Sequence, residues 1–396
     1  MRSEIIRNFA MQCNVISPIM SLHNDLYDSY LHDAVSLLQK LIAAPSISRD
    51  EKAAADIMEH TMCDYGYQPE RIGNNLLVKS SDWDDSRPTL LLNAHIDTVK
   101  PVATWTRDPF TPTVEGDRLY GLGSNDCGGG LVSLLQVFRI LEAPSHHSAM
   151  ALQRKKNYNL IYLASAEEEV SGANGISRVL PLLPPIDVAL IGEPTGMQPA
   201  IAEKGLMVLD VTEEGQAGHA ARDEGVNALY LALDDLQRLR QHRFPDVSPL
   251  LGPVKATATI IQAGTQHNVI PDRCTFTIDV RSNECYTNRQ LYDQFCQLLH
   301  GHVEARSFRL NSSRIDPAHP LVRRALQLPP TPDGLPRRPF GSPTLSDQAL
   351  LACPSLKMGP GDSRRSHTAD EYICLAEVRH AIDDYIALLD GLRMDK

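Results

Sequence analysis

Four short apolar runs constrain the fold of this chain more than any other feature of its sequence. They do not alternate between apolar and polar residues, and they cover Thr89–Ala94, Asn159–Ser165, Val188–Gly192 and Ser355–Met358. Strands without alternation are typical of a parallel sheet that is covered on both faces. Helical and strand patterns alternate from about Asp25 to Gly196. The sequence therefore predicts an α/β fold with a mostly parallel sheet.

A different order of elements begins near Ala202. The patterns predict strand, helix, two strands, helix and strand in the segments 206–212, 226–240, 256–262, 274–281, 288–299 and 302–310. This is the order of a ferredoxin-like α+β unit, which can fold as a small domain of its own. A strand, a glycine loop and a helix then follow. We expect a main domain of residues 1–201 and 311–396, interrupted by an inserted domain of residues 202–310.

Composition excludes several classes of function. The chain has 396 residues, of which 42% are hydrophobic, so it is long enough for two domains with buried cores. Its formal net charge is -11, whereas binding to nucleic acid requires a clustered basic face. No run approaches the roughly 20 apolar residues of a membrane span. We therefore expect a soluble protein that binds neither nucleic acid nor membrane.

The cysteines and the first residues bear on location. The 8 cysteines are scattered without a C-x-x-C pair, which fits a reducing cytoplasm. The apolar residues of the first segment are interrupted by Arg7, Asn14 and Pro18. We interpret this segment as an irregular lead-in and not as a signal peptide.

The run GLGSNDCGGG at residues 121–130 precedes an apolar helical pattern, so its glycines stand at the start of a helix. A dinucleotide-binding loop would read G-x-G-x-x-G there. The sixth place is Asp126, whose carboxylate would repel a phosphate, and this disfavours nucleotide binding. What remains is an acid at a helix start, where the helix dipole favours its charged form. We expect the glycines to leave room beside it for a metal and a substrate.

Metal-ligand residues follow the predicted strands. His95 and Asp97, the triplet Glu167–Glu169, and Glu193 come directly after three of them, and His367 follows the loop after the fourth. Ligand sites of open α/β sheets lie at the carboxyl ends of the strands, so these groups can converge. Two imidazoles and three carboxylates favour a pair of divalent ions, with zinc first. Five side chains give each ion three ligands only if one carboxylate is shared, and we expect Asp126 to be shared.

Each group alone also has a simpler interpretation. His95 and Asp97 can be a polar strand end, and an acidic triplet is usually a solvated face. Glu193 before Pro194 can open a turn, and His367 can be a loop histidine that bonds to the backbone. The occurrence of all of them in order, each after a buried type of strand, favours the metal interpretation.

Six motifs in order resemble the di-zinc aminoacylase and carboxypeptidase family, which includes acetylornithine deacetylase and succinyl-diaminopimelate desuccinylase. The motifs are NAHIDTV, GLGSNDCGGG, SAEEEVSGANG, IGEPTG, GHAARDEGVNA and GPGDSRRSHTADEY, and the resemblance begins at about residue 32. It implies one zinc ion held by His95, Asp126 and Glu193. It implies a second held by Asp126, Glu169 and His367, with cobalt or manganese able to substitute.

The resemblance also implies the catalytic roles. Glu168 takes the position of the general base, and Asp97 that of the residue that orients the His95 ring. The family usually carries Asp-Glu-Glu where this chain carries Glu167–Glu169, so the assignment of base and ligand depends on aligning the last two glutamates, and a register shift by one would change it. The nearby Gly172 supports the register chosen. We expect no catalytic role for Cys127.

Further positions resemble substrate contacts of the family. His219 corresponds to a histidine that donates to the oxyanion, often from the neighbouring subunit. Asn268 and Arg281 correspond to contacts from the inserted lid, although Arg281 could instead form a structural salt bridge. The backbone of Gly359 and Gly361 could bind the amino-acid end of the substrate, or these glycines could serve only the turn.

The implied reaction is hydrolysis of the amide of a small N-acyl-amino acid, with acetylornithine of arginine biosynthesis as the first candidate. Succinyl-ornithine, acetylcitrulline, succinyl-diaminopimelate and dipeptides are alternative substrates. A non-catalytic binding protein on the same scaffold is the alternative from a different class, but the general base and all ligands are present. We expect a homodimer formed through the inserted domain, because its sheet has a free edge.

Overall fold

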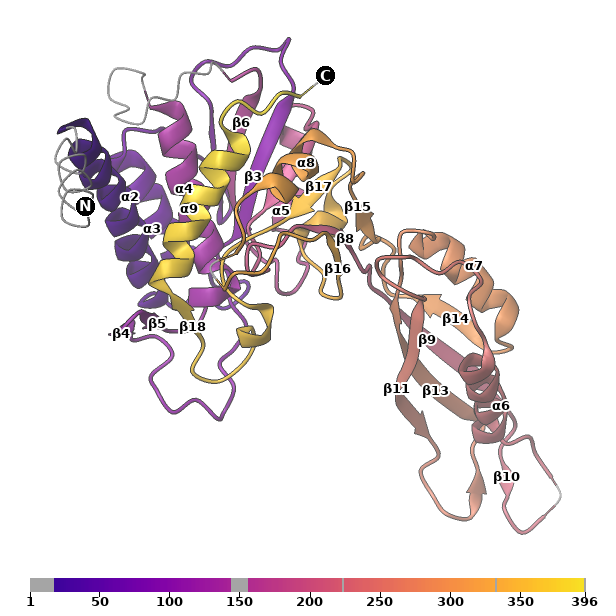
Figure 1. Cartoon of the computed structure of the whole chain (residues 1–396). Coiled ribbons are helices and arrows are strands. Elements are labelled where there is room, and N and C mark those ends of the chain that lie inside the picture. Colours follow the sequence, from indigo (N-terminus) through magenta and orange to yellow (C-terminus); the bar gives the residue numbers. More distant parts are fainter. Residues whose placement is uncertain (1–17, 144–155, 223, 332, 395–396) are drawn as a thin grey trace, which may run out of the picture. The chain divides into compact units, whose positions relative to one another are not determined.

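The computed structural model describes residues 18–143, 156–222, 224–331 and 333–394 (Figure 1). The lead-in interpreted above, residues 1–17, lies outside the described residues. The chain forms two compact units. The first unit comprises Met1–Met197, Gln327–Arg337 and Met358–Lys396, and the second comprises Gln198–Leu326 and Arg338–Lys357.

The strands of the first unit's main sheet follow one another in space as β1 (Glu70–Ile72), β2 (Asn75–Lys79), β6 (Asn159–Ser165), β3 (Thr89–His95) and β7 (Val188–Ile191). The central strands β6, β3 and β7 are parallel, whereas β1 and β2 pair antiparallel at one side. All residues of β3 and β6 are buried, which explains why these strands show no alternation. The carboxyl ends of β3, β6 and β7 therefore lie at the same edge.

Helices cover this sheet. The long helices of the first unit are α2 (Pro18–Ile42), α3 (Lys52–Asp64), α4 (Gly129–Glu142) and α9 (Leu375–Leu389). Helix α4 is buried along nearly its whole length, because it packs on β3 and β6 and is covered by α2 and α9 (Figure 1). A small sheet of β18 (Tyr372–Cys374), β5 (Arg118–Tyr120) and β4 (Thr113–Glu115) links the end of the chain to the segment before α4.

The glycines before α4 serve close packing. A Cβ on Gly130 would lie 1.7 Å from the carbonyl oxygen of Gly192, and a Cβ on Gly129 would lie 2.1 Å from Ile373. These glycines let the start of α4 approach the end of β7. This corrects the expectation that they leave room for a metal and a substrate.

The second unit contains the ferredoxin-like segment. Its elements are β9 (Met207–Glu214), α6 (Ala228–Gln241), β11 (Lys255–Ala263), β13 (Arg273–Arg281), α7 (Asn288–Leu298) and β14 (His302–Ala305). The strands form an antiparallel sheet in the order β11-β13-β9-β14. Its core contains Leu209, Phe276 and Phe295. A two-stranded ribbon of β10 (Gly218–His219) and β12 (Val269–Ile270) belongs to the same segment.

The remaining elements are short. In the second unit β8 (Ala200–Glu203) pairs antiparallel with β15 (Ser313–Arg314) and β17 (Ser355–Lys357) and parallel with β16 (Phe340–Ser342). The short helices and turns are η1 (Ser124–Gly128), α5 (Ile176–Val179), η2 (Leu180–Leu182), α8 (Pro320–Gln327), η3 (Asp347–Leu350) and η4 (Ser363–Arg365). The predicted fold class, a mostly parallel α/β sheet with an inserted ferredoxin-like segment, is confirmed. None of the helices in the described ranges has both the length and the apolar character that a bilayer crossing requires.

Candidate metal centre

A first cluster of donor atoms surrounds the end of β3. The His95 Nε2 lies 3.3 Å from Asp126 Oδ1 and 3.5 Å from Glu193 Oε1. His95 ends β3 and Glu193 follows the parallel neighbour β7, so the sheet itself brings them together. Ligand atoms on one tetrahedral zinc ion, with bonds of about 2.0–2.1 Å, stand about 3.3 Å apart. In this first cluster, formed by His95, Asp126 and Glu193, the two distances from His95 therefore fit ligands of one such ion.

A second cluster shares Asp126. The His367 Nε2 lies 2.9 Å from Glu169 Oε2 and 3.6 Å from Asp126 Oδ2. Asp126 thus presents Oδ1 to His95 and Oδ2 to His367, an arrangement in which one carboxylate can serve two cations. The side chain of His367 is 53% exposed, whereas those of Glu169 and Asp126 are 8% and 12% exposed. The second cluster, Asp126, Glu169 and His367, is therefore the one that faces solvent.

The charges of the two clusters depend on each other. Burial alone would raise the pKa of Asp126, but hydrogen bonding and attraction from His95 and attraction from His367 hold it below its ordinary value. The hydrogen bond to Glu169 is the largest cause that raises the pKa of His367 to about 9. Without a cation, His367 is therefore positively charged near neutral pH and offsets part of the negative charge of the carboxylates. A bound cation would displace that proton, because only the neutral ring is a ligand.

The three glutamates that follow β6 point to different partners. Glu167 is buried, and its carboxylate accepts hydrogen bonds from the Asn174 backbone at 3.2 Å and side chain at 2.9 Å. Glu168 Oε2 lies 3.9 Å from His95 Nε2, beside the first cluster. Glu169 lies in the second cluster. The first glutamate thus holds the turn, and the other two face the candidate centre, which supports the register chosen above.

Asp97 links the two halves of the centre. His95 Nδ1 lies 2.9 Å from the main-chain oxygen of Asp97 and 3.5 Å from its carboxylate Oδ1. That carboxylate accepts hydrogen bonds from Ser48 Oγ at 2.7 Å and from the backbone N–H groups of Glu168 and Glu169 at 3.0 and 3.2 Å. Asp97 therefore orients the His95 ring chiefly through its backbone and fixes the glutamate turn through its side chain.

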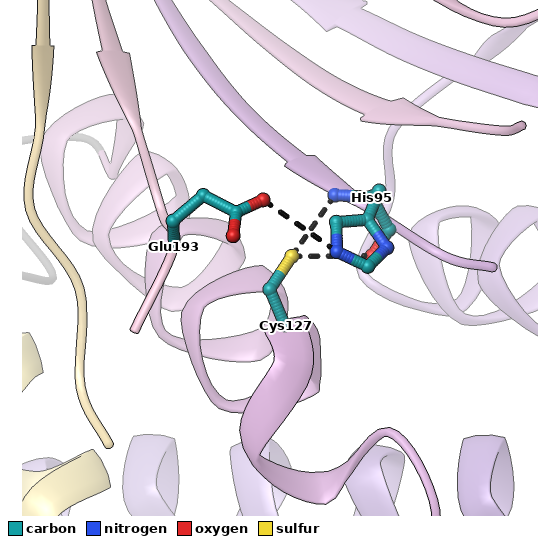
Figure 2. A group of neighbouring side chains, drawn as sticks. All are labelled: His95, Cys127 and Glu193. Atoms are coloured by element: carbon teal, nitrogen blue, oxygen red, sulfur yellow. Dashed lines mark hydrogen bonds and ion pairs between the residues drawn. The ribbon is translucent and has the colours of Figure 1, made fainter. Parts of the chain in front are cut away.

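Cys127 lies beneath the first cluster, as Figure 2 shows with His95 and Glu193. Its Sγ accepts a hydrogen bond from the His95 backbone N–H at 3.1 Å. One possible metal-ligand atom from each of Cys127, His95 and Glu193 lies within 4.8 Å of the other two. Burial raises the pKa of the Cys127 thiol, so the neutral form is favoured. This agrees with the expectation that Cys127 is no nucleophile.

Sequence reasoning missed Glu371. Its carboxylate is 2% exposed and accepts hydrogen bonds from the backbone N–H groups of Gly123, Asn125 and Asp126 at 3.1, 2.8 and 2.9 Å. Burial raises the pKa of Glu371 to about 8. The one sequence feature that could have indicated Glu371 is its position four residues after His367. A carboxylate whose partners are backbone N–H groups leaves no recognisable pattern in a sequence.

The remaining predicted residues lie in other surroundings. His219 and Asn268 belong to the second unit and are exposed. His219 ends β10 and Asn268 directly precedes β12, and the Ala220 N–H donates to the Asn268 backbone carbonyl at 3.0 Å. Arg281, in the same unit, makes a bidentate ion pair with Asp279 at 2.8 and 3.1 Å, which is the structural alternative named above. The geometry of the two clusters does not involve these residues.

Gly359 and Gly361 lie in the first unit and serve its loops. The Gly359 N–H donates to Thr195 Oγ1 at 3.1 Å, and its carbonyl accepts from the Met197 N–H at 2.9 Å. Gly361 has a φ of +84°, and a Cβ there would lie 2.2 Å from the side chain of Asn125. The turn interpretation of these glycines is therefore visible in the structure, and their contact with a substrate stays a prediction.

The chain is similar to known hydrolases. The profile of the family described as Peptidase family M20/M25/M40 matches residues 91–390. An acetylornithine deacetylase of Pectobacterium carotovorum is 31% identical over 372 residues, which cover 86% of this chain and 92% of that protein. One of Klebsiella pneumoniae is 29% identical over 375 residues, with 86% and 92% covered.

Solved structures show the same fold. A tripeptidase from Staphylococcus aureus has a TM-score of 0.70 and 18% identity, and the match covers 91% of this chain and 98% of that one. A dinuclear metal binding peptidase of the M20 family from Bacillus subtilis has a TM-score of 0.69 and 15% identity, with 92% and 98% covered. At these identities the likeness concerns the fold alone.

Proposed function

The chain belongs to peptidase family M20/M25/M40, and we propose that it is a two-zinc deacetylase that releases acetate from acetylornithine. At the coarser level, it is a metal-dependent amide hydrolase. The observation that carries the proposal is the Asp126 carboxylate, which presents one oxygen to His95 and the other to His367. Imidazole and carboxylate donors suit zinc, and cobalt or manganese should substitute for it.

The residues around the clusters supply the proton transfers. A bound pair of divalent ions would acidify water and polarise the scissile carbonyl. Glu168 stands beside the first cluster with its side chain 9% exposed, and it takes the proton of the attacking water. The water oxygen bonds to the carbonyl carbon, the carbon–nitrogen bond breaks, and Glu168 returns the proton to the leaving amine. Asp97 fixes this glutamate by accepting the hydrogen bond of its backbone N–H.

Acetylornithine is proposed as the substrate because the similar deacetylases carry that name over most of this chain. Rates on acetylornithine, succinyl-ornithine, acetylcitrulline, succinyl-diaminopimelate and dipeptides test this choice. We expect kcat/KM for acetylornithine to exceed every other value at least tenfold. A higher kcat/KM for another of these compounds would identify that compound as the substrate and leave the reaction class unchanged. Inactivity on all of them, with metal bound, would defeat the deacylase proposal.

We propose that the second unit contributes substrate contacts. Asn268 and Arg281 are polar groups of that unit, and Arg281 would exchange its ion pair with Asp279 for a carboxylate of the substrate. The backbone of Gly359 and Gly361 is the proposed site of the amino-acid end. His219 is the proposed donor to the oxyanion, supplied by a second copy of the chain.

Two features of the second unit support a homodimer formed through residues 202–310. Strand β11 is an edge strand, and nearly all its residues are exposed. Helix α6 exposes Leu229, Tyr230 and Leu233, with exposed fractions of 39%, 66% and 59%. An unpaired edge beside exposed apolar side chains is typical of a surface that pairs with another copy.

We also propose a cytoplasmic location in which thiols stay reduced. The cysteines of the described ranges, which span both units, are all free. Reduced thiols are typical of cytosolic proteins. A thiol titration of protein isolated under non-reducing conditions tests this, because a blocked thiol pair would point to an oxidising compartment.

A further inference from the structure

Two loops of the first unit carry the ligands that are not fixed by a strand end. The turn 121–128 carries Asp126, and the loop 359–371 carries His367. His95, in contrast, is part of β3, and Glu193 comes two residues after the end of β7. The second cluster therefore takes two of its three ligands from these loops, and the first cluster takes one.

Glu371 joins the two loops. Its carboxylate accepts hydrogen bonds from three backbone N–H groups of the turn, those of Gly123, Asn125 and Asp126, within 2.8–3.1 Å. Its own carbonyl accepts from the Gly121 N–H at 3.0 Å. Because one acceptor binds successive N–H groups around Asp126, it fixes the direction in which that side chain leaves the backbone.

Asn125 makes the second connection. Its side-chain oxygen accepts from the Asp362 N–H at 3.0 Å, and its amide donates to the Asp362 carbonyl at 3.1 Å. The same amide lies 3.4 Å from Ser366 Oγ, next to His367. The side chain is buried, and Gly361 must lack a Cβ for it to fit. Both polar groups of Asn125 are thus used to hold the other loop.

We propose that Asn125 and Glu371, which we call the loop clamp, are positioning residues that hold Asp126 against His367 and so set the affinity of the second cluster for its cation. The inference rests on the proposed two-metal function and goes beyond it. A loosened clamp displaces two ligands of the second cluster but only one of the first. Loss of the clamp should therefore weaken one of the two cations selectively.

Titration of the metal-free full-length chain with Co²⁺, followed by the visible absorption of the bound ion, tests the inference. Glu371→Gln replaces one of the two accepting oxygens with an amide donor, which then faces an N–H donor of the turn. We expect the first ion to bind with affinity within threefold of wild type and the second to bind about 10- to 100-fold more weakly, the usual range for residues that orient ligands. Turnover lost at stoichiometric metal should return with excess Co²⁺.

A matched control separates positioning from folding. Asp384 of α9 is another buried acid, 8% exposed. It pairs with Arg337 at 2.5 Å, and Arg337 also bonds to the main chain of Pro329 and Met197, which are not part of the two loops. Asp384→Asn should lower the melting temperature and leave both binding steps unchanged. Asn125→Ala tests the other half of the clamp and replaces Glu371→Gln if that variant does not fold.

The possible outcomes distinguish a failure of the loop-clamp inference from a failure of the two-metal proposal. Two ions in wild type and a selectively weakened second ion in either clamp variant support the inference. Two ions in wild type with unchanged affinities in the variants, or an equal loss of both ions that Asp384→Asn reproduces, overturn it. A wild-type chain that binds fewer than two ions overturns the two-metal proposal itself.

Discussion

At the scale of single residues, the environment of each acid separates the roles of Glu167, Glu168 and Glu169. Their side chains are identical, and only their partners differ: Asn174 for Glu167, the first cluster for Glu168 and His367 for Glu169. An acidic triplet in a sequence does not contain this information. It follows from the turn after β6, which the Asp97 carboxylate fixes through two backbone N–H groups.

Glu168→Gln tests the assigned base. The variant keeps the size of the side chain and cannot take a proton, so we expect kcat to fall by about 10²- to 10⁴-fold with the metal content unchanged. Metal analysis and steady-state kinetics on the same sample measure both. The control is Glu167→Gln. Its fold-decrease in kcat should be at least ten times smaller than that of Glu168→Gln, because the Glu167 carboxylate bonds to Asn174 of the turn. Full activity of Glu168→Gln would remove its assigned role as the general base.

The sequence predicted the ligand types but not the residues that support them. His95, Glu193 and His367 were accessible because each follows a strand or loop with a recognisable pattern. Asn125 and Glu371 were not, since their partners are backbone groups more than 200 residues away along the chain. The function of Gly130 was misread because the atom that requires it, the carbonyl oxygen of Gly192, also belongs to another segment of the chain.

At the scale of elements, the long buried strands were the easiest to predict. Strand β6 has the predicted bounds, and β3 extends one residue further because His95 still pairs with Ser165. The last strand of the inserted segment, β14, ends at Ala305 and is shorter than expected. It pairs antiparallel with β9, and because β9 begins at Met207, few residues of β9 remain to pair beyond Ala305. The small sheet β18-β5-β4 was not foreseen, because three-residue strands that meet from distant segments leave no periodic pattern.

The contact between β9 and α6 makes a prediction about pH. Glu213 on β9 is 5% exposed, and burial together with the neighbouring Asp235 of α6 raises its pKa to about 7 from 4.5. The folded state thus binds this proton more tightly than the unfolded state. The resulting stability is fully present below pH 4.5 and is lost as the pH rises through about 7. The loss amounts to about 3 kcal/mol at most.

Glu213→Gln should remove this dependence. We expect the difference in unfolding free energy between Glu213→Gln and wild type to shift in favour of the variant between pH 5 and pH 8. Urea unfolding at several pH values measures it, and the titrating groups that do not face Glu213 cancel in the difference. The groups facing Glu213 are Asp235 and Arg238 of α6 and Cys274 of β13. A difference that stays constant across this range would show that Glu213 is ionised throughout.

At the scale of the whole molecule, the proposed dimer can be tested on its surface. Leu233 of α6 is 59% exposed within the apolar face beside edge strand β11. A lysine there would place a charge in the proposed interface, so we expect Leu233→Lys to sediment as a monomer and to lose activity if His219 acts across the dimer. The control is Val247→Lys, at a residue 57% exposed outside these elements. A wild-type chain that is a fully active monomer would exclude the dimer.

The proposed two-metal centre depends most on Asp126 as a ligand shared by two ions. The direct measurement is the number of zinc ions bound per chain at saturation in the wild type, Asp126→Ala and His367→Ala. Because Asp126 belongs to both clusters and His367 only to the second, we predict two ions in the wild type, one in His367→Ala, and loss of tight binding of both in Asp126→Ala. A wild type that binds at most one ion, or an Asp126→Ala variant that still binds two, would contradict the account.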